Sequence, residues 1–536
     1  MRALLSVADK AGLEVFARGL HELGIEIIAT DGTAAALRAA SIPLRTVEEV
    51  TGTPELLGGQ VKTLHPAIMA GILARRDDLA ELAELERHAI APIDLVVCNL
   101  YPFERTVVQQ RARLADALAQ IDIGGVTLLR AAAKNFPAVT VVTRPDDYTA
   151  VLAELRDGGA TQLTTRHRLA ATAMQHTALY DSAIAAYLRH DLPDALFPDE
   201  LTLGLRREET LHYGENPHQL AALYAWAKPE TTAPDATGPG GRALGPARAP
   251  TVAGARRVAG AALSFNNLLD LDAALGVIAA FTAPAAVVIK HTNPCGLACA
   301  DTLVEAYRRA HAGDPVSAYG GILGFNREVD GDTAAEVSQI FYEAIIAPGF
   351  TPEALERLSR KKQLRLLATD TPVGPGAVAA EPGARRLEVR SVSGGLLLQT
   401  PDFIPEGDLH LAPVSERKPT LDEITDLHFA WKVVRHVKSN AIVLAKKLMV
   451  VGVGAGQMNR AYSVQIAVDR AEDRARGSVL ASDAFFPFPD GVERAAKAGV
   501  TAIVQPGGSV RDDDAVRMAN RYGIAMVTTG QRHFRH

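Results

Sequence analysis

The sequence predicts an α/β protein with at least two domains, and three observations support this prediction. At 536 residues the chain is too long for a single hydrophobic core. Its 48% hydrophobic and 22% charged residues are typical of a soluble globular protein rather than a disordered or fibrous one. Short apolar runs alternate with amphipathic segments, which is the pattern of a parallel sheet flanked by helices.

The first domain is expected to span residues 1–199. Strands are predicted over "RALLSV", "IEIIAT", "IDLVVCNL" and "AVTVVT", with helices at Lys10–Leu23 and Thr33–Ala40. The helix-rich stretch 165–188 closes this region, and the following "RHDLPDALFPDE" is typical of a linker.

The second domain is expected to span residues 200–536. It begins with a strand and a turn in "LTLGLRREETLHYGENPHQLAALYA". Residues 228–250, rich in Pro, Gly and Ala, predict a surface insertion without a packed element. A second weak stretch, 367–386, separates two α/β subdomains at about 200–375 and 376–536, whose strands include "AAVVIK", "AIVLA" and "TAIVQP".

Charge and cysteine content narrow the functional classes. The net charge of −6 gives no overall attraction to nucleic acid or to an anionic membrane, so neither partner is expected and any anion needs a local basic pocket. Three cysteines cannot form a disulfide framework, and the start of the chain does not have the pattern of a signal peptide. A cytoplasmic location is therefore expected.

The stretch "KHTNPCGLAC" (Lys290–Cys299) raises the hypothesis of a zinc site. Zinc-dependent deaminases combine H-x-E with a later P-C-x-x-C. Here the second cysteine comes one position too late, and none of the 15 histidines begins an H-x-E. No catalytic metal is expected, and two small thiols packed beside a turn are the simpler interpretation.

Lys290 and His291 themselves form the second hypothesis for this stretch. They directly follow an apolar strand and precede "TNPCG", a run expected to form a turn. Catalytic groups often lie where a buried strand of an α/β sheet gives way to its loop. The histidine could act as a general base and the lysine could stabilise an oxyanion, although a solvated lysine beside a hydrogen-bonded histidine would look the same.

Several loops of the first domain are suited to an anion. "SVADK" and "TDGT" each follow a predicted strand and precede a predicted helix, where backbone N–H groups and hydroxyls can bind phosphate. Helix capping explains the same residue types equally well. Lys62, Tyr101, Asp122 and Lys134 occupy comparable loop positions, with surface salt links or a half-buried ring as the alternatives.

Two stretches of the last subdomain could also contact ligands. "GVGAGQMNR" fails both nucleotide fingerprints, so it predicts either a cradle for a phosphomonoester or a tight strand-to-helix turn. Phe485, Phe486 and Phe488 in "SDAFFPFPD" could stack on a flat heterocycle or could simply belong to the core.

Together these stretches resemble the bifunctional enzyme of the last two steps of purine biosynthesis, aminoimidazole carboxamide ribonucleotide (AICAR) formyltransferase joined to inosine monophosphate (IMP) cyclohydrolase. Thirteen stretches in order carry the resemblance: SVADKAGL, TDGTAAALR, GGQVKTLHP, CNLYPF, DIGGVTLLRAAAKN, YGENPHQ, KHTNPCG, DPVSAYGGI, IIAPGF, KSNAIVLAK, GVGAGQMNR, SDAFFPFPD and TTGQRHFRH. The resemblance implies a methylglyoxal-synthase-like parallel-sheet domain followed by two cytidine-deaminase-like α/β subdomains without zinc.

The resemblance implies formyl transfer from 10-formyltetrahydrofolate to AICAR in the second domain. His291 would remove a proton from the substrate amine, and Lys290 would stabilise charge on the formyl group. The residues implied for the ribonucleotide are His212, Tyr213, Gly320, Glu343, Asn440, Arg460 and Arg532. The residues implied for the folate are Ala461, Phe485, Asp490, Ser509 and Val510.

For the first domain the resemblance implies dehydrative closure of formyl-AICAR to IMP. Lys134 would act as acid and base, assisted by Tyr101 and Asp122. The residues implied for substrate binding are Ser6, Lys10, Thr30, Asp31, Gly32, Thr33, Lys62, Thr63, Cys98, Asn99 and Gly124. A homodimer is also implied.

One departure and two alternatives accompany this resemblance. The family's "LRYGENPHQ" is "LHYGENPHQ" here, so His212 replaces an arginine and weakens the expectation of tight phosphate binding there. One alternative is a formyltransferase whose first domain only regulates it. The other is a nucleotide-sensing protein without catalysis, against which Lys290, His291 and Lys134 argue.

Overall fold

The structure, a computed structural model, describes residues 1–54, 56–101, 103, 107, 114–189, 192, 196–226, 250–375, 387–402 and 409–536. The predicted insertion at 228–250 therefore lies almost entirely outside the described residues. The chain divides into two units, Met1–Arg206 with Ala225–Asp235, and Arg207–Tyr224 with Ala236–His536. Among the described residues, no helix combines the length and apolarity needed to cross a membrane.

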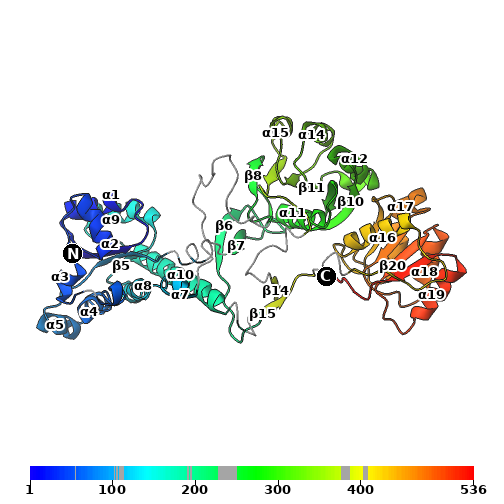
Figure 1. Ribbon diagram of the computed structural model, residues 1–536. Coiled ribbons are helices and arrows are strands. Elements are labelled where there is room, and N and C mark those ends of the chain that lie inside the picture. The colour runs from blue at the N-terminus through cyan, green and yellow to red at the C-terminus, as the bar shows by residue number, and fades with distance from the viewer. Residues whose placement is uncertain are drawn as a thin grey trace. The chain divides into compact units, whose positions relative to one another are not determined.

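The first unit, blue to cyan in Figure 1, is built on one parallel sheet whose five strands have the order β3-β2-β1-β4-β5. Leu4 lies opposite Ile28 on one side and Val96 on the other, and all three are fully buried because helices cover both faces. The strands are β1 (Arg2–Val7), β2 (Glu26–Ala29), β3 (Arg45–Thr46), β4 (Leu95–Asn99) and β5 (Thr140–Val142). The predicted parallel α/β architecture of this region is confirmed.

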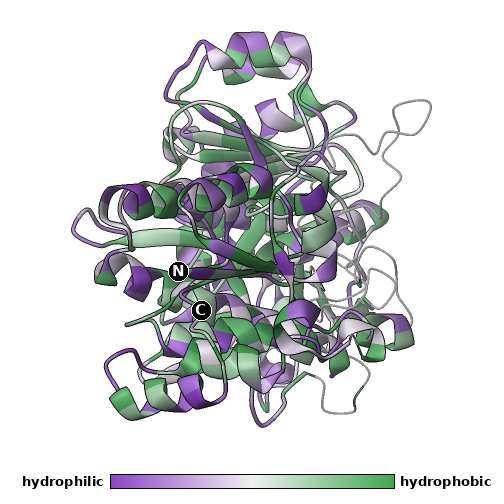
Figure 2. Cartoon of the chain, turned by 90° about the vertical axis from the view of Figure 1, so that its left-hand side faces the viewer, coloured by the Kyte–Doolittle hydropathy of each residue, from purple (hydrophilic) through white to green (hydrophobic). Residues whose placement is uncertain are grey.

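The helices of the first unit connect these strands. They are α1 (Leu13–Glu22), α2 (Asp31–Ala39), α3 (Val47–Thr51), α4 (Pro66–Leu73), α5 (Leu79–Arg87), α7 (Leu114–Leu118), α8 (Gly124–Lys134), α9 (Tyr148–Gly158) and α10 (Leu163–Leu188). Single helices carry both hydrophilic and hydrophobic residues, as Figure 2 shows, which is the amphipathic pattern of helices that cover a sheet.

The second unit contains two six-stranded sheets with the same strand order. One is β10-β9-β11-β12-β13-β8, and the other, taken from its opposite end, is β18-β17-β19-β20-β21-β16. The first consists of β8 (Arg256–Ala259), β9 (Ala285–Lys290), β10 (Asn293–Cys299), β11 (Ile322–Phe325), β12 (Ala344–Ala347) and β13 (Arg365–Ala368). The second consists of β16 (Ala412–Pro413), β17 (Ile442–Ala445), β18 (Val450–Gly454), β19 (Val479–Ser482), β20 (Ala502–Gln505) and β21 (Ala525–Thr528).

The helices follow the same internal repeat. The first copy has α11 (Phe265–Ile278), α12 (Leu303–Gly313), α13 (Pro315–Ala318), α14 (Gly331–Val337) and α15 (Pro352–Ser359). The second has α16 (Leu421–Val434), α17 (Arg460–Ala471), α18 (Asp490–Lys497) and α19 (Asp512–Arg521). Helices α11 and α16 share one buried cluster with strands of both sheets, so the two copies have a common core. Two hairpin sheets, β6 (Leu205–Leu211) with β7 (Ala221–Trp226) and β14 (Glu388–Val392) with β15 (Gly395–Gln399), complete the elements.

The run "TNPCG" does not form the expected turn. Only His291 and Thr292 turn, both with positive φ (51° and 62°), and β10 begins at the next residue. Pro294 can belong to this strand because β10 lies at the edge of its sheet, where a missing N–H is tolerated.

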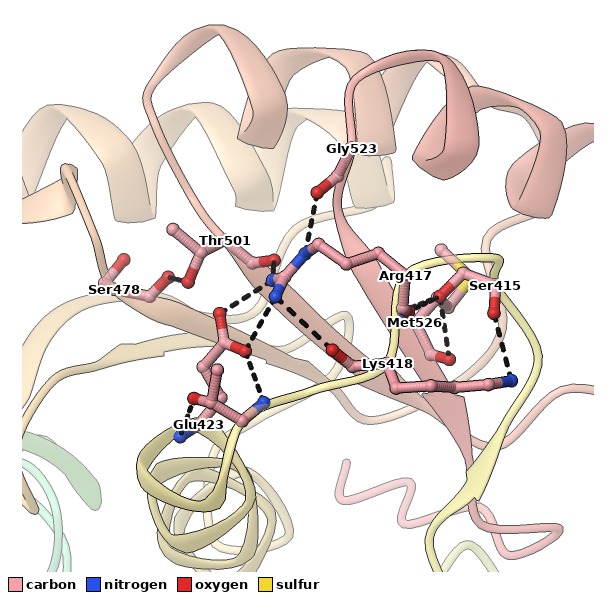
Figure 3. Close-up of polar contacts among 9 residues, drawn as sticks. Ser415, Arg417, Lys418, Glu423, Ser478, Thr501, Gly523 and Met526 are labelled. Atoms are coloured by element: carbon pink, nitrogen blue, oxygen red, sulfur yellow. Dashed lines mark hydrogen bonds and ion pairs between the residues drawn. The ribbon is translucent and has the colours of Figure 1, made fainter.

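A half-buried ion pair fixes the start of α16 in the second copy (Figure 3). The Arg417 guanidinium donates to both carboxylate oxygens of Glu423 at 2.7 and 3.0 Å, and to the carbonyl oxygens of Gly523 and Thr501. The carboxylate also accepts the Thr420 N–H at 2.8 Å. Burial disfavours ionisation of Glu423, but the hydrogen bonds from Arg417, Thr420 and Thr501 outweigh it and lower its pKa to about 2.

This pair predicts an acid-dependent loss of stability. Because the folded-state pKa of Glu423 is below its ordinary value of 4.5, the stabilisation is complete above that pH and disappears as the pH falls towards 2. The Tm of the wild type should therefore fall more steeply between about pH 5 and about pH 3 than that of Glu423→Gln. Glu416→Gln, at an exposed glutamate, is the control and should follow the wild type; parallel curves for all three proteins would contradict the prediction.

Candidate functional sites

The first site lies where the strand order of the first unit reverses, between β1 and β4. Ligands of open α/β sheets bind at the carboxyl ends of strands at such a point. Ser6 and Thr30, at the ends of β1 and β2, are hydrogen-bonded through their hydroxyls at 3.1 Å. The Asn99 side-chain oxygen at the end of β4 accepts N–H groups of Ala8 (2.7 Å) and Asp9 (2.9 Å), so it fixes the loop after β1.

Lysines and a helix N-terminus supply positive charge to this edge. The Lys62 ammonium pairs with Asp31 at 2.9 Å, and the Lys10 ammonium donates to the Val7 carbonyl at 2.8 Å. Burial lowers the pKa of Lys10, although the charge of Asp9 partly opposes this. A Cβ at Gly124, the first residue of α8, would lie 2.5 Å from Thr63 Oγ1, so glycine lets this helix end approach the lysine loop.

Thr33 and Cys98 have structural roles here. The buried Thr33 hydroxyl accepts the Val7 N–H at 3.0 Å, so it closes the β1 loop. The Cys98 thiol is buried and faces the Gly125 carbonyl at 3.7 Å, and burial raises its pKa. Gly32 lies exposed in the first turn of α2.

Asp122 is a partly buried carboxyl group of this site whose pKa is shifted. Its carboxylate accepts the Gly125 N–H at 2.7 Å, and its backbone N–H donates to the Tyr180 hydroxyl at 2.8 Å. Burial raises the pKa of Asp122 and outweighs the N–H groups of Gly125 and Tyr101 and the charge of Lys62, which lower it. A carboxyl group with a raised pKa, close to a lysine, is suited to proton transfer.

Tyr101 and Lys134, both expected beside Asp122, are placed differently from each other. Tyr101 exposes 59% of its surface, so its ring is available to a ligand rather than part of the core. Lys134 is exposed at the last residue of α8, whereas Gly124 begins that helix. Eleven residues span about 16 Å. Lys134 therefore lies at the opposite end of α8 from Gly124.

The second site centres on the turn between β9 and β10. The Lys290 ammonium donates to the carbonyl oxygens of Tyr319 (2.9 Å) and Gly320 (3.1 Å), which leaves one of its three N–H bonds for a ligand. His291 is exposed at positive φ. The carbonyl of His291 accepts the Thr292 hydroxyl and the Asn293 amide, at 2.7 and 2.9 Å.

Helix α11 presents polar side chains to the same turn. Asp270 accepts the Thr292 N–H at 2.6 Å. Burial raises the pKa of Asp270, opposed by that N–H and by the charges of His291 and Lys290, whereas Glu343 raises it further. Glu343 itself accepts the Asn267 amide at 2.7 Å. Asp270 and Asn267 were not among the residues predicted from the sequence, because their contacts with Thr292 and Glu343 join positions that are distant in sequence.

The turn of "YGENPHQ" joins this group. The Asn266 amide donates to the Glu215 carbonyl at 3.3 Å, so the segment carrying His212 and Tyr213 lies at the start of α11. His212 is exposed and its ring contacts that of Tyr213, with centroids 5.5 Å apart. The predicted residues Tyr213, Lys290, Gly320 and Glu343 therefore come from segments that contact one another.

A second group of predicted residues lies at the carboxyl ends of β19, β20 and β21. Arg460 is buried, and its guanidinium donates to Ser482 (2.8 Å), Asp483 and the Asn440 side chain (2.6 Å). Arg460 therefore organises Asn440. One hydrogen bond, from the Lys438 N–H to the Asn293 side chain at 3.0 Å, links this group to the β9–β10 turn.

Two of the three glycines of "GVGAGQMNR" serve packing. A Cβ at Gly454 would overlap the Ser463 carbonyl, and one at Gly452 would overlap that of Ala467, so both let α17 lie directly on β18. Of the two interpretations left open for this stretch, the strand-to-helix turn is the one that these contacts support.

The remaining predicted residues lie around the same edge of the second sheet. Ala461 is buried beside Arg460, Asp490 begins α18, and Ser509 accepts the Arg511 N–H at 3.0 Å. Val510 is fully exposed, and Arg532 stacks on Phe534. The aromatic cluster divides between two roles: Phe486 is core, Phe485 is half-buried, and Phe488 is exposed under the Arg511 guanidinium.

The cysteines of "KHTNPCGLAC" are poor metal ligands. Burial raises the pKa of Cys295 and of Cys299 to about 12, whereas zinc binds the thiolate. The Cys295 thiol faces the Val288 carbonyl at 3.5 Å inside its own hairpin. In the part of the chain that the structure describes, no three His, Cys, Asp or Glu side chains are placed to hold a metal ion.

The fold is that of an α/β protein, with lysines, hydroxyls and a helix N-terminus at one sheet edge of the first unit and a Lys-His pair in the second. The profile of the family "AICARFT/IMPCHase bienzyme" matches residues 132–470, and that of "MGS-like domain" matches residues 12–127. "Bifunctional purine biosynthesis protein PurH" of Anoxybacillus flavithermus is 49% identical and covers 100% of this chain and 99% of that protein. The protein of the same name from Listeria monocytogenes serotype 4a is 48% identical, with 100% of both chains covered.

The chain belongs to the AICARFT/IMPCHase bienzyme family. The family indicated by the thirteen stretches is thus confirmed, and with it the prediction of an enzyme of purine biosynthesis with formyltransferase and cyclohydrolase activities.

Proposed function

We propose that the second unit transfers a formyl group from 10-formyltetrahydrofolate to AICAR and that the first unit closes formyl-AICAR to IMP. The observation that carries the proposal is the β9–β10 turn, where an anchored ammonium and an exposed imidazole on neighbouring residues lie beside a carboxylate.

Formyl transfer needs a base and a stabilised oxyanion because the substrate amine is conjugated and weakly nucleophilic. The amine nitrogen attacks the formyl carbon, His291 takes the amine proton, and the bond from that carbon to the folate nitrogen breaks. The folate nitrogen then takes a proton. The free N–H of Lys290 stabilises the formyl oxygen during this step, with the ammonium held in place by Tyr319 and Gly320.

The residues of the second unit divide into two groups of ligand contacts. Gly320 and Glu343 contact the ribonucleotide from the first copy of the repeat, and His212 and Tyr213 contact it from the turn between β6 and β7. Asn440, held by Arg460, and Arg532 contact it from the second copy, and Ala461, Phe485, Asp490, Ser509 and Val510 line the folate site. The location of this group at the carboxyl ends of parallel strands supports the assignment.

Ring closure depends mainly on proximity, since both reacting groups belong to one molecule. The carboxamide nitrogen attacks the formyl carbon and water leaves. The lysines, hydroxyls and backbone N–H groups at the ends of β1 and β2 bind the phosphate, with Asn99 beside the base. Asp122, whose pKa burial raises, exchanges protons with the reacting groups, assisted by Tyr101 and Lys62.

We further propose a cytoplasmic homodimer acting on these small molecules, without nucleic acid or membrane partners. Val510, Met458, Tyr319 and Phe488 expose between 54% and 106% of their surface next to the predicted ligand contacts. Apolar groups of this size gain free energy when a second copy covers them.

The test is the product formed by purified protein from AICAR and 10-formyltetrahydrofolate, separated by chromatography. IMP is expected. Accumulation of formyl-AICAR without IMP would leave a formyltransferase whose first unit only regulates it. No product, with retained binding of AICAR, would leave a nucleotide-sensing protein.

A further inference from the structure

The internal repeat allows the two hairpin turns of the second unit to be compared residue by residue. Lys290 is the last residue of β9 and Lys446 directly follows β17, and each is followed by two residues with positive φ. The Lys446 ammonium donates to the Arg476 carbonyl at 2.8 Å, just before β19, as that of Lys290 donates to carbonyls just before β11. The lysine is therefore part of the shared fold.

An aspartate belongs to this repeated arrangement. Asp426 on α16 accepts the N–H groups of Lys447 and Leu448, both at 2.7 Å. Asp270 on α11 accepts the N–H of Thr292 at 2.6 Å. Asp270 and Asp426 are separated by the same number of positions as Lys290 and Lys446, so they are counterparts. Each carboxylate holds a turn whose left-handed residues would otherwise be strained.

The two copies differ in what surrounds the carboxylate. Asp426 supports a turn that carries Lys447 at the position where the first copy carries His291. Asp270 accepts one N–H of its turn rather than two and faces His291 and Lys290 from β9, with Glu343 from the segment before β12. In the first copy, the aspartate that holds the turn therefore also lies beside the residues proposed for formyl transfer.

We infer that Asp270 is a positioning residue for formyl transfer, which holds the His291–Thr292 turn so that the imidazole meets the substrate amine. This inference rests on the proposed function of the second unit. Misplacement of a catalytic group by about 1 Å lowers a rate by roughly 100-fold, so a support of this turn should act on kcat.

The test compares Asp270→Asn, Asp270→Ala and the matched control Asp426→Asn, in the full-length protein. Asparagine keeps an acceptor for the Thr292 N–H but removes the charge, whereas alanine removes both. We expect kcat of formyl transfer to fall about 10-fold in Asp270→Asn and roughly 100-fold in Asp270→Ala, with KM for AICAR changed less than about threefold. Asp426→Asn should keep kcat within about twofold, and closure of supplied formyl-AICAR should be unchanged in all three.

The outcomes separate the inference from the function on which it rests. Wild-type protein without formyl transfer overturns the proposed function and this inference together. An active wild type with unchanged kcat in Asp270→Ala overturns the inference alone. Equal losses of kcat in Asp270→Asn and Asp426→Asn, with equal losses of Tm, would also overturn it, because both carboxylates would then act only through the stability of the fold.

Discussion

Replacing His291 with asparagine is expected to lower kcat of formyl transfer by about 100-fold to 10,000-fold, the usual contribution of a positioned general base. Asparagine is the informative substitution because φ at this position is 51°, and asparagine accepts left-handed backbone better than alanine does. The variant therefore keeps the turn and loses the base. The measurement is the rate of formyl-AICAR formation at saturating AICAR and 10-formyltetrahydrofolate.

Ring closure supplies the control within the same molecule. The His291→Asn protein, given formyl-AICAR, should form IMP at the wild-type rate, because the cyclohydrolase residues belong to the first unit. A substituted protein that still transfers the formyl group at the wild-type rate would remove His291 from the mechanism. A loss of both activities would indicate damage to the whole chain instead.

The alternation of apolar runs was sufficient to predict the fold class and strands such as β1, β2, β4, β5, β9, β17 and β20. Lys290 was found because β9 is an uninterrupted apolar strand, and a lysine at its end stands out. The repeat within the second unit was not predicted from the sequence, since what the two copies share is their strand order and a few turn residues. Their relation depends on hydrogen bonds such as that of Asp270, which join residues distant in sequence.

For single site residues too, the sequence predicts location along the elements but not contacts between residues distant in sequence. Asn99 follows a strand at the reversal of the strand order, and this location could be predicted from the order of elements alone. Arg460 looked like a phosphate ligand because it follows a glycine-rich run. Its burial and its ion pair with Asp483 are properties of tertiary packing, and so is the close contact of α17 with β18 at Gly452 and Gly454.

The role implied for Lys134 in ring closure conflicts with its position at the end of α8. The resemblance implies that it acts as acid and base, yet α8 places it about 16 Å from the helix end where Gly124 and Asp122 lie. Asp122 has the raised pKa, the hydrogen bond to Gly125 and the nearby Lys62. Within one chain, proton transfer during ring closure is therefore expected to depend on Asp122.

Asp122→Asn should consequently lower the rate of IMP formation from supplied formyl-AICAR by about 100-fold or more, and Lys134→Ala by less than about 10-fold. Asparagine can still accept the Gly125 N–H, so the start of α8 is kept and the missing function is proton exchange. If Lys134→Ala loses as much activity as Asp122→Asn while its Tm is unchanged, the ammonium must arrive from another copy of the chain. Mixing the two variants then decides the matter, because an assembly that shares the site regains activity from one intact pair, whereas sites contained within single chains do not.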